Sequence, residues 1–134
     1  MKLMNREELA WAAGLFDGEG SVGVYNRGDK GNTWHSLKYR RLMLSIAQAD
    51  RQVLDRFQKA IFGLGHINGP RTLNSPFKAK SQWFFTTGSF EHVQAIIAAL
   101  WVFLSPVKKE QAKQALIDYA NYRAEWQGRK LPSN

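Results

Sequence analysis

The spacing of apolar residues along the chain predicts four helices and four strands. Around Leu42, Leu44 and Ile46, apolar and other side chains alternate, which is typical of a strand with one buried face. Apolar residues recur at helical spacing elsewhere, and serine, asparagine, proline and glycine mark the ends of those segments. The predicted helices cover residues 6–17, 50–62, 90–100 and 106–127, and the predicted strands cover residues 21–27, 34–48, 66–68 and 80–87.

The predicted order of elements is α-β-β-α-β-β-α-α, in which an α-β-β unit occurs twice. Two hairpins that each precede a helix indicate an α+β fold, with one antiparallel four-stranded sheet covered by helices on one face. Such a sheet leaves its other face open to a partner. No linker divides the chain, so we expect one domain over residues 1–127 and a frayed tail over residues 128–134.

Composition and charge narrow the classes of partner that this chain could bind. The chain has 134 residues, of which 44% are apolar, and its 19 basic against 11 acidic residues give a net charge of +8. This charge favours a polyanion, although a basic protein kept soluble by its charge fits as well. There is no cysteine, so thiolate zinc sites and disulfides are excluded. The apolar stretch over residues 95–104 is too short to span a membrane. We expect an intracellular protein without a membrane partner, in an organelle or in a bacterial or phage host.

The first predicted helix is apolar on every side over residues 10–16, AWAAGLF. At 100° per residue the side chains separate by size. The large residues of one arc suit the chain's own core, and the small residues of the other arc allow another helix to approach closely. That second helix belongs either to the same chain or to a second copy across a two-fold axis. The small arc holds Ala10, Ala13 and Gly14, and the large arc holds Leu9, Trp11, Leu15 and Phe16.

The same helix ends in Asp17-Gly18-Glu19-Gly20. Two carboxylates at a helix C-terminus oppose the macrodipole and therefore do not stabilise the helix. The glycines allow unusual backbone angles and the close approach of another backbone. An ordinary turn explains the glycines but not both acids, and a metal site is the alternative.

Residues 12–20, AAGLFDGEG, resemble the nine-residue motif that names the LAGLIDADG family of homing endonucleases. Alanine replaces the first leucine, phenylalanine the isoleucine, glycine the second alanine and glutamate the last aspartate. The order of elements also matches the family along most of the chain. The sequence is therefore similar to the single-motif type, in which two copies pair to cut double-stranded DNA.

The resemblance implies that the motif helices of two subunits pack at a two-fold axis, with their acidic ends meeting over the DNA. Glu19 would be the ligand of Mg²⁺ or Mn²⁺, and Gly18 would offer its backbone carbonyl. Asp17 would join Ala10, Ala13 and Gly14 at the dimer interface. Glutamate in place of aspartate adds one methylene and displaces the carboxylate.

The resemblance also supplies three catalytic candidates. Gln48 matches a glutamine that orients the attacking water, and Lys108 in the KKEQA segment matches a lysine near that water and the phosphate. Arg51 matches a basic residue that contacts the cleaved phosphate, although the spacing around it departs from the family. Outside this resemblance, a glutamine at a strand end is usually a loop contact and adjacent lysines are usually solvated surface.

The open sheet face is expected to enter the major groove, where arginine pairs with guanine and asparagine or glutamine with adenine. A seven-residue strand spans roughly 23 Å, or about seven base pairs, so two subunits with their loops would read about twenty. A homodimer implies a pseudo-palindromic target. The candidate DNA-binding residues are Tyr25, Arg27, Lys30, Asn32, Tyr39, Arg41, Met43, Ser45, Asn68, Arg71, Lys78, Lys80 and Gln82.

The leading hypothesis is a site-specific, metal-dependent DNA endonuclease that hydrolyses one phosphodiester in each strand. One alternative is a non-cleaving relative, either a maturase that binds intron RNA or a DNA-binding regulator. The presence of Glu19, Gln48 and Lys108 together favours cleavage, because a regulator has no need of an acid that repels DNA. A protein-interaction module fits the five tryptophans but not the positive charge.

Overall fold

The structure, a computed structural model, describes residues 5–26, 40–72 and 81–130, and side chains up to residue 125. The helices of this part are α1 (Arg6–Glu19), α3 (Arg51–Ala60), α4 (Phe90–Leu100), the short 3₁₀ helix η1 (Trp101–Phe103) and α5 (Pro106–Lys130). The strands are β1 (Gly20–Asn26), β2 (Arg40–Gln48), β3 (His66–Thr72) and β4 (Ser81–Thr87).

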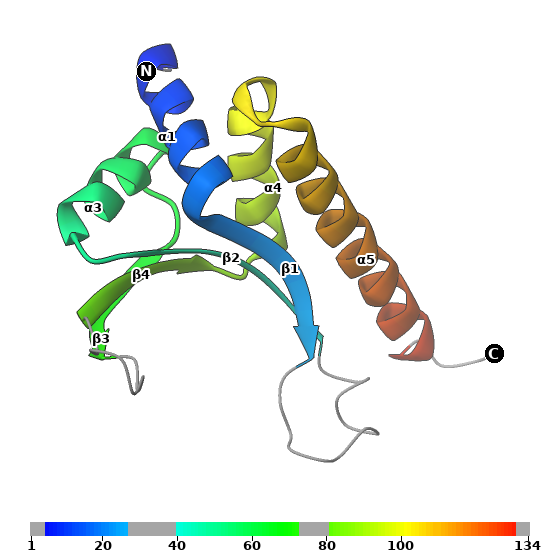
Figure 1. Cartoon of the computed structure of the whole chain (residues 1–134). Helices are drawn as coiled ribbons and strands as arrows, with labels where there is room; N and C mark the ends of the chain where they lie inside the picture. Colours follow the sequence, from blue (N-terminus) through cyan, green and yellow to red (C-terminus); the bar gives the residue numbers. More distant parts are fainter. Residues whose placement is uncertain (1–4, 27–39, 73–80, 131–134) are drawn as a thin grey trace.

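The four strands form one antiparallel sheet in the order β1-β2-β4-β3. The sheet curves into an arch, with the helices gathered on one side of it and the other side left open (Figure 1). The predicted α+β fold, with an antiparallel sheet covered by helices on one face, is therefore confirmed. No helix in the described ranges is both long and apolar enough to cross a membrane.

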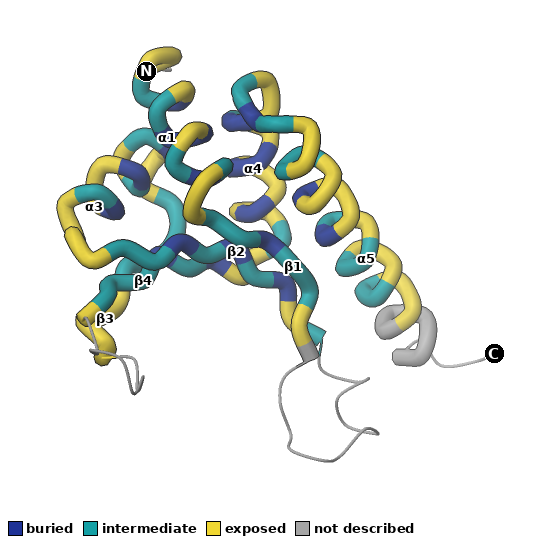
Figure 2. Tube along the Cα trace, in the orientation of Figure 1, coloured by how far each residue is buried: buried dark blue, intermediate teal, exposed yellow. Residues whose placement is uncertain are grey.

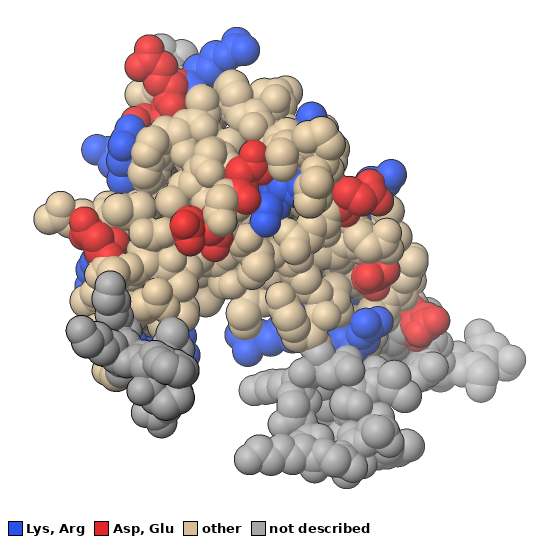
Figure 3. Space-filling view, viewed as in Figure 1, with Lys and Arg blue, Asp and Glu red and all other residues tan. Residues whose placement is uncertain are grey.

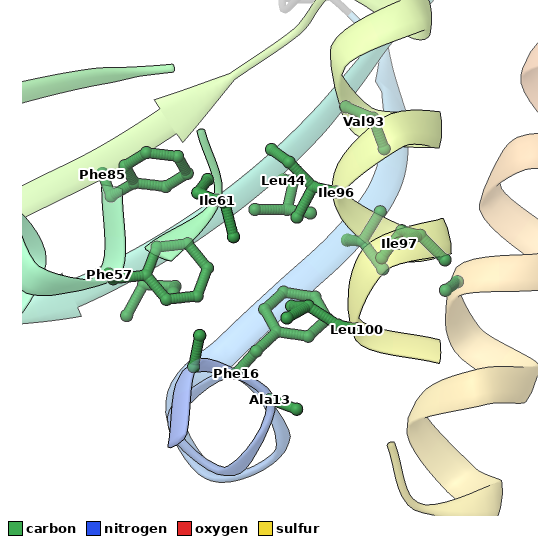
Figure 4. Packing of buried hydrophobic residues seen from close by; sticks show 14 of the residues in the cluster. Ala13, Phe16, Leu44, Phe57, Ile61, Phe85, Val93, Ile96, Ile97 and Leu100 are labelled. Atoms are coloured by element: carbon green, nitrogen blue, oxygen red, sulfur yellow. The ribbon is translucent and has the colours of Figure 1, made fainter. Parts of the chain in front are cut away.

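The core lies between the sheet and the helices (Figure 2). Leu42, Leu44 and Ile46 of β2 are fully buried, as their alternation predicts. Phe57 of α3 and Phe85 of β4 meet edge to face at 5.1 Å between ring centroids, and α4 contributes Val93, Ile96, Ile97 and Leu100 (Figure 4). Aromatic pairs prefer this geometry, which adds to the free energy of burying their area.

The start of α1 is tied to α3. Asn5 caps the helix, because its side chain accepts a hydrogen bond from the Glu8 amide at 3.1 Å. The Glu8 carboxylate is bonded to α3. It accepts two hydrogen bonds from Arg56, at 3.0 and 2.8 Å, which hold the pKa of Glu8 below its ordinary value. The Arg56 guanidinium also lies 3.9 Å from the centroid of the Trp11 ring.

Several boundaries differ from the prediction. Helix α1 continues to Glu19, so Gly18 lies inside the helix and does not end it. Strand β3 extends to Thr72 across a bulge between Asn68 and Arg71, where we expected a loop from Pro70. Helix α5 runs to Lys130, so the first part of the predicted frayed tail is helical. For β3, the pairing of Arg71 and Thr72 with β4 extends the strand beyond its local signal.

Candidate functional site

The acidic end of α1 is presented at the surface, directly before β1. Phe16 is fully buried, while Gly18 and Glu19 are exposed. A Cβ atom at Gly20 would collide with the Phe16 ring, so glycine is required there by close packing. Within the described part of the chain, the Glu19 carboxylate has no hydrogen-bond or ion-pair partner. Glu19 is therefore available to a ligand, as a metal-binding role requires.

Asp17 has a partner inside its own chain. Both of its carboxylate oxygens lie 3.1 Å from the Ser105 amide, and Ser105 Oγ also donates to Asp17 at 3.1 Å. Ser105 is also the N-cap of α5, because its Oγ accepts a hydrogen bond from the Lys108 amide at 3.2 Å. The Asp17 carboxylate thus joins the end of α1 to the start of α5 within one chain, and its place at a dimer interface stays a prediction.

We expect Ser105→Ala to lower the free energy of unfolding by about 1–2 kcal/mol, because it removes a helix cap and leaves Asp17 with one donor fewer. Asp17→Ala should have a similar effect, and the double variant should lose less than the sum. Urea denaturation measures all three. Ser89→Ala is the matched control, because Ser89 caps α4 in the same way by accepting a hydrogen bond from the His92 amide. The effects of Ser89→Ala and Asp17→Ala on the free energy of unfolding should be additive. Additive effects at Ser105 would contradict the link.

The Asp17–Ser105 contact places Lys108 beside the motif. Lys108 Nζ donates to the Gly20 carbonyl at 2.7 Å and to Gln111 Oε1 at 3.0 Å, and it lies 5.3 Å from the centroid of the Phe16 ring. Residues that are far apart in sequence are thus brought together at the end of α1. Lys108, which the resemblance matches to a catalytic lysine, thus lies at the end of α1, and its catalytic role stays a prediction.

Gln48 stands at the end of β2, on the side of the sheet that carries α1. The β1–β2 ladder ends where Gly20 pairs with Ile46, so Gln48 continues past that pair toward the end of α1. Its cross-strand partner on β4 is Trp83. In the described residues, Gln48 makes no hydrogen bond to Glu19 or Lys108.

Arg51 is the first residue of α3 and is held by two contacts. Its guanidinium lies 4.8 Å from the centroid of the Trp83 ring, and its Nε lies 3.5 Å from an Asp55 oxygen. Trp83 therefore connects Arg51 to the end of β2 where Gln48 stands. Strand alternation places Trp83 in the core, and it does pack there, but alternation does not reveal that its ring also supports Arg51.

The residues at the end of α1 suit a hard cation only in part. The Glu19 carboxylate and the Gly18 carbonyl are oxygen donors, which Mg²⁺ prefers. The described residues contain no group of three or more acidic, histidine or cysteine side chains able to hold a metal ion. Among the described residues at this end of α1, the Glu19 carboxylate is the unpartnered acidic group, so a metal ion bound here would need further donors.

The burial of the side chains on α1 differs from the predicted separation into an arc of large core residues and an arc of small contact residues. Ala13 is fully buried in the chain's own core, so its assignment to the dimer interface is wrong. Trp11 and Leu15, expected in the core, are only partly buried. The small residues left on the surface are Ala10, Gly14 and Gly18, one helical turn apart. Cβ atoms at Gly14 and Gly18 would meet nothing within 4 Å, so this strip is open.

The open face of the sheet carries the described candidates for DNA contact. Tyr25 pairs with Arg41, Ser21 with Ser45, and Arg71 with Gln82, all opposite the buried face. Ser21 Oγ and Ser45 Oγ lie 3.1 Å apart. The described candidates on this face are Tyr25, Arg41, Met43, Ser45, Asn68, Arg71 and Gln82. The candidates Arg27, Lys30, Asn32, Tyr39, Lys78 and Lys80 lie outside the described residues.

Lys and Arg side chains appear along the lower, hollowed edge of the molecule, on the open side of the sheet (Figure 3). Two further residues of this face, Phe84 and Thr86 of β4, were missed by sequence reasoning. Because Phe85 is buried and side chains alternate along a strand, both of its neighbours point to the open face.

Comparison with known structures identifies the fold. The homing endonuclease I-CvuI in complex with its target aligns over 83% of this chain and 64% of its own, with 24% identity and a TM-score of 0.61. The LAGLIDADG endonuclease I-GzeII with its DNA target aligns over 89% and 37%, with 18% identity and a TM-score of 0.61. The archaeal intron-encoded endonuclease I-Vdi141I with DNA aligns over 96% and 87%, with 15% identity and a TM-score of 0.58.

This chain has the fold of the LAGLIDADG homing endonucleases, and the resemblance seen in the motif is confirmed at that level. It spans less than two thirds of the length of the I-CvuI and I-GzeII chains. No family model matches the sequence, and no curated protein sequence matches it significantly.

Proposed function

We propose that this chain is one subunit of a homing endonuclease, which pairs with a second copy and cuts both strands of a long DNA site. The arrangement at the end of α1 carries the proposal. Glu19 is exposed there, Lys108 Nζ is held at the next carbonyl, and a strip of small residues leads up to them. This combination of acid, cation and open helix surface is what two-fold assembly of a nuclease site needs.

The strip of Ala10, Gly14 and Gly18 is the proposed dimer contact. Small side chains let two helix backbones approach closely, and a two-fold axis beside the strip would bring the acidic ends of both helices together. Pairing would also supply further ligands for a metal ion, because it would place two Glu19 carboxylates at one location. Phosphate oxygens of bound DNA would supply further ligands.

Glu19 and the Gly18 carbonyl would hold Mg²⁺ or Mn²⁺, which neutralises charge on the scissile phosphate and promotes attack by water. The chain's own residues would assist in defined ways. Lys108, already fixed by the Gly20 carbonyl and Gln111, places a positive charge beside the phosphate. Gln48 at the end of β2 can accept or donate a hydrogen bond to the attacking water. Arg51, held on Trp83, can contact a phosphate oxygen.

The open sheet face would lie in the major groove, which admits a two-stranded β-ribbon. Its candidates combine arginine, amide and aromatic side chains, and the net charge of +8 favours a polyanion. The structures of I-CvuI, I-GzeII and I-Vdi141I contain DNA, which supports the same use of this fold here. With two subunits, we expect a pseudo-palindromic site of about twenty base pairs.

Selection of cut sites from a randomised DNA library in the presence of Mg²⁺ tests the proposal. We expect enrichment of one pseudo-palindromic sequence, cut once in each strand, and loss of cutting when the metal is removed with EDTA. Selection by binding alone, with Ca²⁺, should return the same sequence. Enrichment by binding without cutting would instead indicate a DNA-binding regulator, and no enrichment in either selection would contradict a DNA-directed function.

A further inference from the structure

Phe84 occupies an unusual place for an aromatic residue. Its neighbour Phe85 is fully buried and pairs with the core residue Ile46, so Phe84 points to the opposite, open face of the sheet. Its cross-strand partners there are Asn68 on β3 and the small Ala47 on β2. Phe84 is half-buried and belongs to the central part of the face proposed to meet DNA.

Arg71 is held directly against this ring. Its guanidinium carbon lies 4.3 Å from the centroid of Phe84, although Arg71 pairs with Gln82 in the ladder. The bulge between Asn68 and Arg71 shifts the register of β3, and bulges re-aim the side chains that follow them. At Gly69 a Cβ would lie 3.0 Å from the Gln82 carbonyl and 3.1 Å from Trp83 Cα, so glycine permits this close approach of the strands.

The pair has a defined recognition chemistry. A phenylalanine in the major groove makes apolar contact with the thymine methyl group, and arginine bonds the O6 and N7 atoms of guanine with its planar fork. Stacking on Phe84 orders the guanidinium before DNA binds, so less side-chain entropy is lost on contact. The guanidinium carbon and the ring centroid lie 4.3 Å apart, so the bases that the two side chains reach must lie close together. The two side chains can thus address neighbouring base pairs.

Given the proposed DNA-binding role of the open face, on which this assignment rests, we infer that Phe84 and Arg71 form one base-reading unit specific for a thymine and a guanine in neighbouring base pairs. In a symmetric dimer the same two bases recur in both half-sites. Phe84 determines the preference for thymine, and Arg71 determines the preference for guanine.

The test uses the site selected by binding in Ca²⁺ and base analogues that remove single contacts. Replacing the assigned thymine by deoxyuridine removes its methyl group, and we expect about fourfold weaker binding for one lost buried methyl. Replacing the assigned guanine by 7-deazaguanine removes N7, and we expect about tenfold weaker binding. The same replacements at other positions of the half-site provide the background.

Variants connect each base to its side chain. Phe84→Asn should bind thymine and deoxyuridine equally, whereas Phe84→Leu should retain part of the preference. Arg71→Met keeps a long side chain but has no hydrogen-bond donor, so its sensitivity to 7-deazaguanine should disappear. Phe90→Leu and Arg123→Met are matched controls, because Arg123 lies 5.1 Å from the Phe90 ring on the helical side. Both controls should keep the sensitivity to both analogues.

The outcomes separate the two levels of the proposal. A selected site without neighbouring thymine and guanine in each half, or analogue effects that persist in Phe84→Asn and Arg71→Met, overturns the base-reading unit and leaves the endonuclease proposal standing. A library that yields no enriched sequence overturns both. Circular dichroism melts show whether each variant is folded, and Phe84→Leu provides a reading if Phe84→Asn does not fold.

Discussion

Glu19→Gln is expected to reduce DNA cutting about a thousandfold or more, because the metal contributes several kcal/mol to phosphate chemistry and a neutral amide is a much poorer ligand. Binding should persist or become tighter, since the variant removes one negative charge that would face the phosphates. Glu19 is exposed and has no partner in the described part of the chain, so the fold should be unaffected. Cleavage of the selected site and binding in Ca²⁺ measure the two effects separately.

Two variants make this result specific. Glu19→Asp keeps the carboxylate and should retain cutting, because aspartate is the residue of the family motif that the sequence resembles. Glu125→Gln removes an exposed carboxylate near the far end of α5 and should cut normally. Normal cutting by Glu19→Gln would show that the metal is held elsewhere.

Gly14→Leu should weaken the proposed dimer, with a rise of about 10- to 100-fold in its dissociation constant, because a large side chain prevents close approach of two helices. The isolated chain should tolerate the change. A Cβ at Gly14 would meet nothing within 4 Å, and leucine favours a helix more than glycine does. Analytical ultracentrifugation over a concentration series gives the dissociation constant, and a denaturation curve gives the stability of the monomer.

Matched substitutions test whether the position matters. Gly14→Ala should weaken the dimer less than Gly14→Leu, because one methyl group displaces the helices less. Ala120→Leu enlarges an exposed small residue of α5, away from α1, and should leave the dimer intact. A Gly14→Leu protein that remains dimeric would place the contact on another surface.

The sequence by itself predicted the order of the elements and singled out the acidic end of the first helix as a candidate site. Alternation around Leu42, Leu44 and Ile46 predicted a half-buried strand because successive side chains in a strand point to opposite faces. The motif at residues 12–20 identified the acidic end of the first helix for a local reason. Two acids and two glycines at a helix end are visible without any knowledge of distant contacts.

Only the tertiary structure decided which way individual side chains of that helix point. Ala13 and Gly14 are adjacent in sequence and similar in size, yet Ala13 is buried in the core of the chain and Gly14 is exposed. Asp17 accepts a hydrogen bond from Ser105, and Trp83 packs against Arg51, because segments far apart in the chain meet there. The bulge that brings Arg71 over Phe84 likewise depends on strand pairing. Local patterns specify which residues can form an element, but long-range packing selects the face that each side chain occupies.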